Sequence, residues 1–211
     1  MTYAELTTRL QEWWESTEAT LVSNVDVFIE YAEKRIYRSI DLDETHKEDT
    51  AAMVAGTATV TVPTGTIVIL SVQLIQSNVR TFLLPKDPSF IDDYTGNRVT
   101  QGTPLYYAKS DDATILLAPT PDTSDTLAFR ITYRPTQLAS GQTTTWLSLN
   151  APDLLFYSCM LELLTFQKAE QDMIQEYRGK YEQAVKEVLM EENARNRTDA
   201  YRNGEIRMNA G

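Results

Sequence analysis

The stretch Ser23-Asn-Val-Asp-Val-Phe-Ile-Glu-Tyr-Ala-Glu-Lys-Arg-Ile-Tyr-Arg-Ser-Ile40 has the clearest periodic pattern in the sequence. Its apolar residues recur at intervals of three and four, as on one face of an α-helix. They are Val25, Phe28, Ile29, Ala32, Ile36 and Ile40. Charged residues such as Glu33 and Arg38 fall on other faces, and Ser23 is a candidate N-cap because Asp26 follows three residues later. The stretch predicts an amphipathic helix.

A shorter helical pattern precedes it, near residues 3–15. Thr2 and Glu5 have the spacing of a capping box, and apolar residues follow at helical intervals. Trp13 fits the apolar face and is expected in the core. Trp14 points about 100° away around the helix and is a candidate for a contact between subunits.

The other end of the chain is also helical in pattern. Asn150-Ala-Pro-Asp153 combines a capping residue, a first-turn proline and an acid near the helix N-terminus. Leu154, Leu161 and Leu164 then share one face. A polar patch over residues 167–172 interrupts the apolar pattern, so two helices and one kinked helix fit equally well.

Between the helical ends the period changes to that of β-strands. Six segments are β-branched or alternate between apolar and polar residues, and turn residues separate several of them. They are residues 58–62, 67–75, 80–84, 105–108, 114–117 and 126–133. Residues 86–102 have few periodic apolar positions and are expected to form a loop against the sheet.

The expected fold class is α+β, a helical bundle formed by the two ends with an inserted antiparallel β module and an extended C-terminal arm. The bundle is expected over residues 1–55 and 147–192, the module over 56–146 and the arm over 193–211. The expected bundle core includes Phe28, Ile29, Ile36, Leu154, Leu161 and Leu164.

The arm has a composition unlike the rest of the chain. It holds four arginines against two acids, about +2, whereas the whole chain is −11, so residues 1–192 carry −13. With few large apolar side chains, such a segment does not order by itself and needs a partner surface. The expected partner-binding residues of this docking arm are Arg195, Arg197, Tyr201, Arg202, Ile206, Arg207 and Met208.

The composition, hydropathy and charge of the chain exclude several classes of protein. No apolar run approaches 18 residues, the N-terminus lacks the apolar core of a secretory signal, and the single Cys159 rules out an internal disulfide framework. The acidic balance argues against binding of nucleic acid by the body through phosphate contacts.

Residues that carry chemistry are scarce, and we expect no enzyme, no cofactor and no metal site. The only histidine, His46, lies in a charged stretch and is expected in a solvated loop. Cys159 lies among apolar positions and is expected to be buried. The pairs Asp92-Asp93 and Asp111-Asp112 fit turns better than a cation site. The glutamates Glu170, Glu176, Glu182, Glu187, Glu191 and Glu192 are expected on a solvated helix face.

Several short motifs, taken in order, resemble the podovirus-like adaptor proteins of tailed bacteriophages, also called head–tail connector or head-completion proteins. The motifs lie in Phe28–Arg38, Gly102–Ala108, Leu116–Pro121, Ile131–Pro135 and Ala151–Leu164. Together they span about residues 3–190. One element departs from the pattern, because the usual proline–aspartate pair appears only as Leu84-Pro-Lys-Asp87.

The resemblance implies a structural role with no catalytic residues. Such adaptors form a ring, usually of twelve copies, that joins the portal protein to the tail nozzle or tail tube. The ring extends a channel through which DNA passes without specific binding, and a fibre protein is a further candidate partner. The resemblance implies assembly in the host cytoplasm, a final place at the head–tail interface of the virion, and a C-terminal segment that reaches the portal.

Two alternatives stay open. A different neck or tail protein, such as a tail-tube component, would be β-rich throughout, whereas this chain has helical ends. A virion-associated cell-wall hydrolase would use paired carboxylates as acid and base, but the acids here fall mostly on solvated faces.

Overall fold

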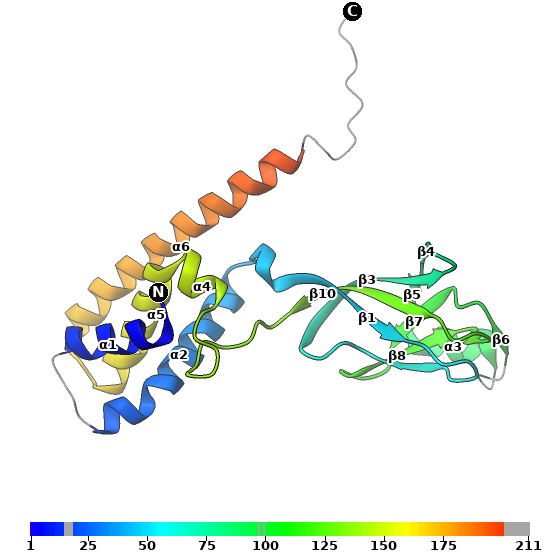
Figure 1. Ribbon diagram of the computed structural model, residues 1–211, viewed down its shortest axis with the longest axis horizontal. Helices are drawn as coiled ribbons and strands as arrows, with labels where there is room; N and C mark the ends of the chain where they lie inside the picture. The colour runs from blue at the N-terminus through cyan, green and yellow to red at the C-terminus, as the bar shows by residue number, and fades with distance from the viewer. Residues whose placement is uncertain (15–18, 97, 99, 201–211) are drawn as a thin grey trace, which may run out of the picture. The chain divides into compact units, whose positions relative to one another are not determined.

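The computed structural model describes residues 1–14, 19–96, 98 and 100–200, and Figure 1 shows their arrangement along the chain. The chain divides into two compact units. The bundle unit comprises Met1–Asp43 and the chain from Thr136 onward, and the inserted unit is Glu44–Pro135. Helices therefore come from both ends, and most paired strands of the insertion are antiparallel, which confirms the predicted α+β class. The inserted unit begins and ends about ten residues earlier in the sequence than the expected range 56–146.

The helices of the bundle unit begin and end as follows. They are α1 (Tyr3–Trp14), α2 (Ala19–Ser39), α4 (Trp146–Asn150), α5 (Pro152–Phe166) and α6 (Gln171–Ala200). The predicted capping box of α1 is present, because Thr2 N donates to Glu5 Oε2 at 2.8 Å and Glu5 N donates to Thr2 Oγ1 at 3.3 Å. Ser23 is not an N-cap, since α2 already begins at Ala19 and the Ser23 hydroxyl donates to the carbonyl of Thr20.

The break between α5 and α6 settles an alternative that the sequence left open. Helix α5 ends at Phe166, and Lys168 adopts a left-handed backbone with φ of 54°. A right-handed helix does not continue through such a residue. The polar patch therefore separates two helices.

Helix α5 is the centre of the bundle. Residues on most of its faces are buried, because α1, α2, α4 and α6 all contact it. All six residues expected in the bundle core have little or no exposed surface: Phe28, Ile29, Ile36, Leu154, Leu161 and Leu164. A hydrogen bond from Tyr3 Oη to Asp26 Oδ1 at 2.6 Å joins α1 to α2 and raises the pKa of Tyr3 to about 12.

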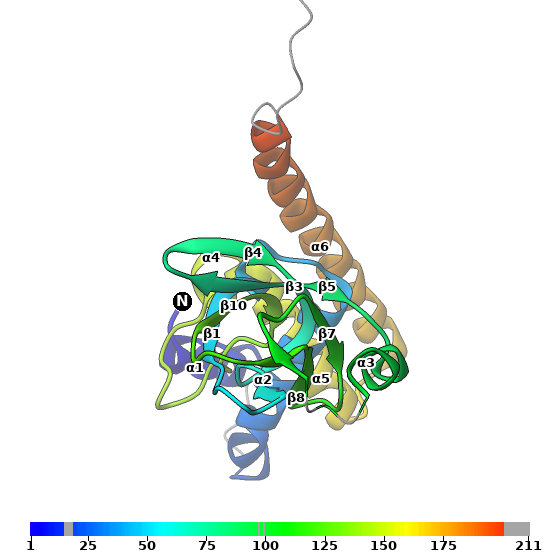
Figure 2. The same cartoon turned by 90° about the vertical axis from the view of Figure 1, so that its right-hand side faces the viewer.

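The inserted unit contains two four-stranded sheets, whose strands Figure 2 shows. The first has the order β1 (His46–Ala52), β10 (Thr126–Tyr133), β3 (Thr66–Gln76) and β4 (Val79–Phe82). The second has the order β2 (Thr59–Thr61), β8 (Thr114–Ala118), β7 (Tyr106–Lys109) and β5 (Leu84–Pro85). A small parallel pair joins β6 (Gln101–Gly102) to β9 (Thr120–Pro121). One cluster of buried side chains, including Val72, Phe129, Ile115 and Leu117, contains residues of both sheets.

Two segments of this unit differ from the sequence-based expectation of loops. Strand β1 includes His46, which is half-buried and lies opposite Thr132, so the histidine is not in a solvated loop. Within residues 86–102 lies helix α3 (Pro88–Thr95), whose N-cap Asp87 accepts a hydrogen bond from Ser89 N at 3.0 Å. A proline in the first turn and an aspartate cap explain why this short helix starts there.

Candidate partner-binding surfaces

The predicted arm begins as a continuation of helix α6. The helix runs to Ala200, so residues 193–200 are helical rather than extended, and Arg195 and Arg197 lie on its last turns. The other predicted arm residues lie outside the described residues: Tyr201, Arg202, Ile206, Arg207 and Met208.

One side of α6 is buried against the bundle. The buried positions Tyr177, Ala184 and Val188 follow helical spacing and end at Glu192, which is 4% exposed. The prediction of a solvated Glu192 is therefore wrong, because the stripe of buried positions continues one turn beyond Val188. The other five glutamates of the predicted solvated face are exposed.

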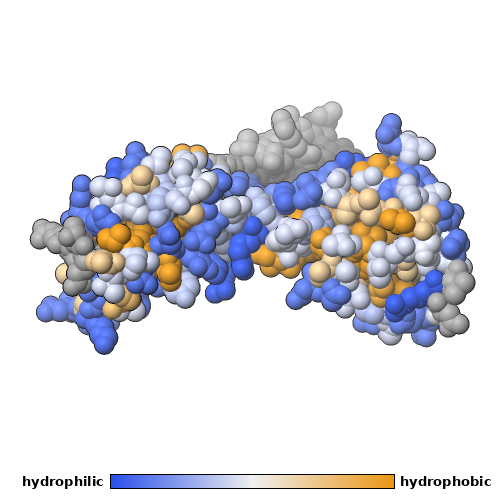
Figure 3. Space-filling model, turned by 60° about the horizontal axis from the view of Figure 1, so that its bottom comes forward, coloured by the Kyte–Doolittle hydropathy of each residue, from blue (hydrophilic) through white to orange (hydrophobic). Residues whose placement is uncertain are grey.

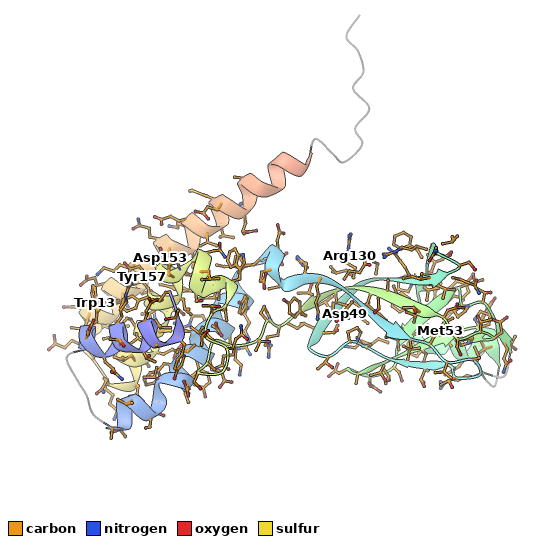
Figure 4. All side chains as sticks on the ribbon, in the orientation of Figure 1. Trp13, Asp49, Met53, Arg130, Asp153 and Tyr157 are labelled. Atoms are coloured by element: carbon orange, nitrogen blue, oxygen red, sulfur yellow. The ribbon has the colours of Figure 1, made fainter. Side chains whose placement is uncertain are left out.

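An aromatic hollow lies on the bundle between α1 and α5. It encloses about 260 Å³ and is lined by Arg9, Trp13, Pro152, Asp153, Phe156 and Tyr157. The Trp13 ring packs edge-on against Phe156 with centroids 5.5 Å apart, yet the tryptophan is 57% exposed. Figure 4 shows Trp13, Asp153 and Tyr157 close together on this surface.

The expectation that Trp13 belongs to the core is therefore wrong. Leu6 and Leu10 occupy the buried face of α1, whereas Trp13 lies at its rim. Tryptophan, tyrosine and arginine are enriched among the few residues that contribute most of the binding free energy at protein interfaces. The side chain of Trp14 lies outside the described residues.

A second, basic hollow lies on α2. It encloses about 500 Å³ and is lined by Tyr31, Lys34, Arg35, Arg38, Ser39 and Glu162. Lys34 pairs with Glu30, and Arg35 pairs with Glu162 and so joins α2 to α5. Lys34 and Arg35 are thus already paired with carboxylates, and Arg38 is the third cationic side chain that lines the hollow.

A buried carboxylate on α2 binds the segment that follows the inserted unit in the sequence. Glu33 is 3% exposed, although the sequence places it among the polar positions of α2. Its carboxylate accepts hydrogen bonds from Leu138 N at 3.1 Å and from Thr145 Oγ1 at 3.3 Å. Thr145 is also the N-cap of α4. Burial raises the pKa of Glu33, and the two hydrogen bonds oppose that shift.

We expect Glu33→Ala to destabilise the protein by about 1–3 kcal/mol, because it leaves two buried donors without their acceptor. Glu33→Gln keeps an acceptor and should cost much less. Because the pKa of Glu33 is raised in the folded protein, the free energy of unfolding of the wild type decreases as pH rises through that pKa. The stability of Glu33→Gln relative to the wild type should therefore increase from about pH 4 to about pH 7.

Denaturant titrations across that pH range check this prediction, with Glu30→Gln as the control because Glu30 lies on the same helix and is far less buried. A pH-independent difference between Glu33→Gln and the wild type would contradict the assigned role of the buried carboxylate.

Three of the four aspartates considered for a cation site have structural partners. Asp92 pairs with Arg98 at 2.7 Å, and Asp112 pairs with Lys109 at 2.9 Å. Asp111 accepts hydrogen bonds from Ala113 N and Thr114 Oγ1. Cys159 is fully buried, and burial raises its thiol pKa well above the ordinary value. Among the described residues, no group of three or more histidine, cysteine, aspartate or glutamate side chains is placed to hold a metal ion.

The described parts of the chain contain no helix with both the length and the apolar content needed to cross a membrane. The described residues form an α+β protein with hollows on the surface of its bundle unit. The sequence matches the family model of the SU10 adaptor protein over residues 1–207, and the chain belongs to this family. This confirms the resemblance to the adaptors of tailed bacteriophages, and the protein is a structural adaptor of a phage particle. No curated protein matches the sequence.

Proposed function

We propose that this chain is the ring-forming adaptor that joins the portal to the tail nozzle or tail tube and extends the DNA channel. The observation that carries the proposal is the family match, which covers both compact units and reaches residue 207. The protein would assemble in the host cytoplasm and end at the head–tail interface of the virion.

The charge distribution supports a role as a DNA conduit. Residues 1–192 carry a charge of −13, and negative walls disfavour adhesion of phosphates. DNA would therefore pass through the ring without being held.

The arm, residues 193–211, is the proposed portal-binding segment. Helix α6 is anchored by buried residues as far as Glu192 and carries the first two arginines of the arm beyond them. This anchoring would present the rest of the arm to an acidic partner surface. The low apolar content of the arm favours a segment that gains stability from a partner surface rather than from a core of its own.

The two bundle hollows are candidates for contacts between neighbouring copies in the ring. A ring needs a head-to-tail interface, in which two different surfaces of the same chain meet. The aromatic hollow on α1 and α5 and the basic hollow on α2 are two such different surfaces. We propose twelve copies, as the family resemblance implies.

Ring formation should depend on the portal. Ordering of the arm and of interface side chains opposes association of the free chain, so the purified protein should sediment as a monomer or small oligomer at micromolar concentration. Addition of purified portal from the same phage should produce a larger complex with adaptor and portal in fixed ratio. A stable twelve-membered ring in analytical ultracentrifugation without portal would contradict this proposal.

A further inference from the structure

The first sheet of the inserted unit has two edges of opposite character. The β1 edge carries Lys47, Glu48 and Asp49, and charged residues on an edge strand prevent pairing with other strands. Along the other edge, β4 covers only Gln73–Gln76 of the longer strand β3. The contact extends by one further hydrogen bond, which Leu83 N donates to Val72 O at 2.9 Å, and then stops.

The rest of this β3 edge is open. On the side away from β10, no strand among the described residues pairs with residues 67–71. Ile67, Val68 and Leu70 are each about half exposed, at 50%, 48% and 50%. Apolar side chains reach the surface of this unit in several places, as one face in Figure 3 shows. An open, apolar strand edge is a template for pairing with another extended chain.

The open edge borders a hollow of about 420 Å³ with walls from both sheets. Residues 66–69 of β3 form one wall, and Pro85, Lys86 and residues 107–109 of β7 form the other. Strand β7 has an open edge here too, because β5 pairs only with Tyr106 and Tyr107. A strand added to β3 could therefore place side chains into a preformed hollow of the size of small ligand pockets.

The hollow is basic at its rim. Lys109 is paired with Asp112, but among the described residues Lys86 pairs with no carboxylate. The Lys86 ammonium instead lies 5.0 Å from the centre of the Phe90 ring. A carboxylate on an incoming strand would find a charge partner in Lys86.

Charge distinguishes between the occupants that this site could take. Symmetric pairing of two β3 edges would give Lys86 no charge partner, because residues 66–71 of β3 contain no acidic side chain. The arm of this chain has a net positive charge and complements Lys86 poorly. An acidic strand from a different protein meets neither obstacle.

We infer that the β3 edge binds an extended, acidic strand of a neighbouring virion protein by β-strand addition. The strand would pair with the β3 backbone near Val68, insert apolar side chains into the hollow and place a carboxylate beside Lys86. This inference rests on the proposed function only in that the neighbours are virion proteins.

The test uses particles that contain the full-length chain with a photo-crosslinking benzoylphenylalanine in place of Val68. Val54, which is 57% exposed in the same unit, is the matched control position. The position-68 probe should crosslink to a peptide of a different virion protein with alternating apolar residues and at least one acid. The position-54 probe should not capture that peptide. Capture of another copy of this chain alone, or no crosslink at position 68 in complete particles, would overturn the inference.

Charge reversal gives a second readout on the same particles. Lys86→Glu should lower the crosslink yield at position 68 by at least about tenfold. Lys47→Glu should not, although Lys47 also lies over an aromatic ring, that of Tyr133 at 4.5 Å. An unchanged yield with Lys86→Glu would overturn the acidic partner. The number of adaptor copies per particle is counted in parallel, because a chain missing from the particles would refute the proposed function rather than this inference.

Discussion

Deletion of residues 193–211 should leave a folded protein that no longer joins phage heads. The described side chains in this range, Asn193 and Ala194, are exposed, so the deletion removes no described part of the buried core. It does remove all four arginines that we propose to contact the portal. Heads incubated with the truncated protein should bind at least about tenfold less of it than of the full-length chain.

A charge-matched pair of variants separates the role of the arginines from the length of the arm. Replacing Arg195, Arg197, Arg202 and Arg207 by glutamate should abolish joining, whereas replacing them by lysine should retain much of it. Thermal unfolding checks that each variant is folded. Normal occupancy of heads by the truncated protein, measured by quantitative gel analysis of purified particles, would show that the arm is not the portal-binding segment.

Leu161→Ala should destabilise the bundle by about 2–5 kcal/mol, because it removes buried apolar atoms and leaves a cavity. Leu161 lies on the central helix α5, is 6% exposed and belongs to the main apolar cluster of the bundle. This loss is a large share of the 5–15 kcal/mol that typically separates folded and unfolded states. Urea denaturation followed by circular dichroism measures it.

The matched control is Leu149→Ala, the same substitution on α4 at a position that is 60% exposed. It should change the free energy of unfolding by less than about 0.5 kcal/mol, as surface substitutions usually do. Equal effects of the two substitutions would contradict the placement of α5 at the centre of the bundle.

The periodic helices were predictable because their apolar faces repeat over several turns. The pattern of α2 from Val25 to Ile40 and the capping box at Thr2 both correspond to what the structure shows. The start of α2 was not predictable in this way, since Ser23 has the residue type of a cap but lies inside a helix that begins at Ala19.

The segments that differed have weak or misleading local patterns. Strand β1, with the sequence HKEDTAA, is a polar edge strand, and its pairing with β10 depends on residues far along the chain. Helix α3 is only eight residues long, so few periodic apolar positions mark it. Local sequence carries little information about such tertiary pairing.

The surfaces were harder to predict than the core. Trp13 and Glu33 differ from what their residue types suggest. The tryptophan, expected to be buried, is exposed, and the glutamate, expected to be exposed, is buried. The burial of Glu33 depends on Leu138 and Thr145, which lie more than 100 residues away in the sequence. The open edge of β3 became visible only from the pairing of the strands.

The most direct test of the proposed function is an electron cryomicroscopy image of the purified virion, with and without this chain. We expect density for a ring of this protein between the portal and the tail nozzle or tail tube at one capsid vertex. Particles that lack the chain should have full heads without tails. Density for the chain only along the tail tube or at the distal tail tip, with the portal bound directly to another protein, would contradict the account.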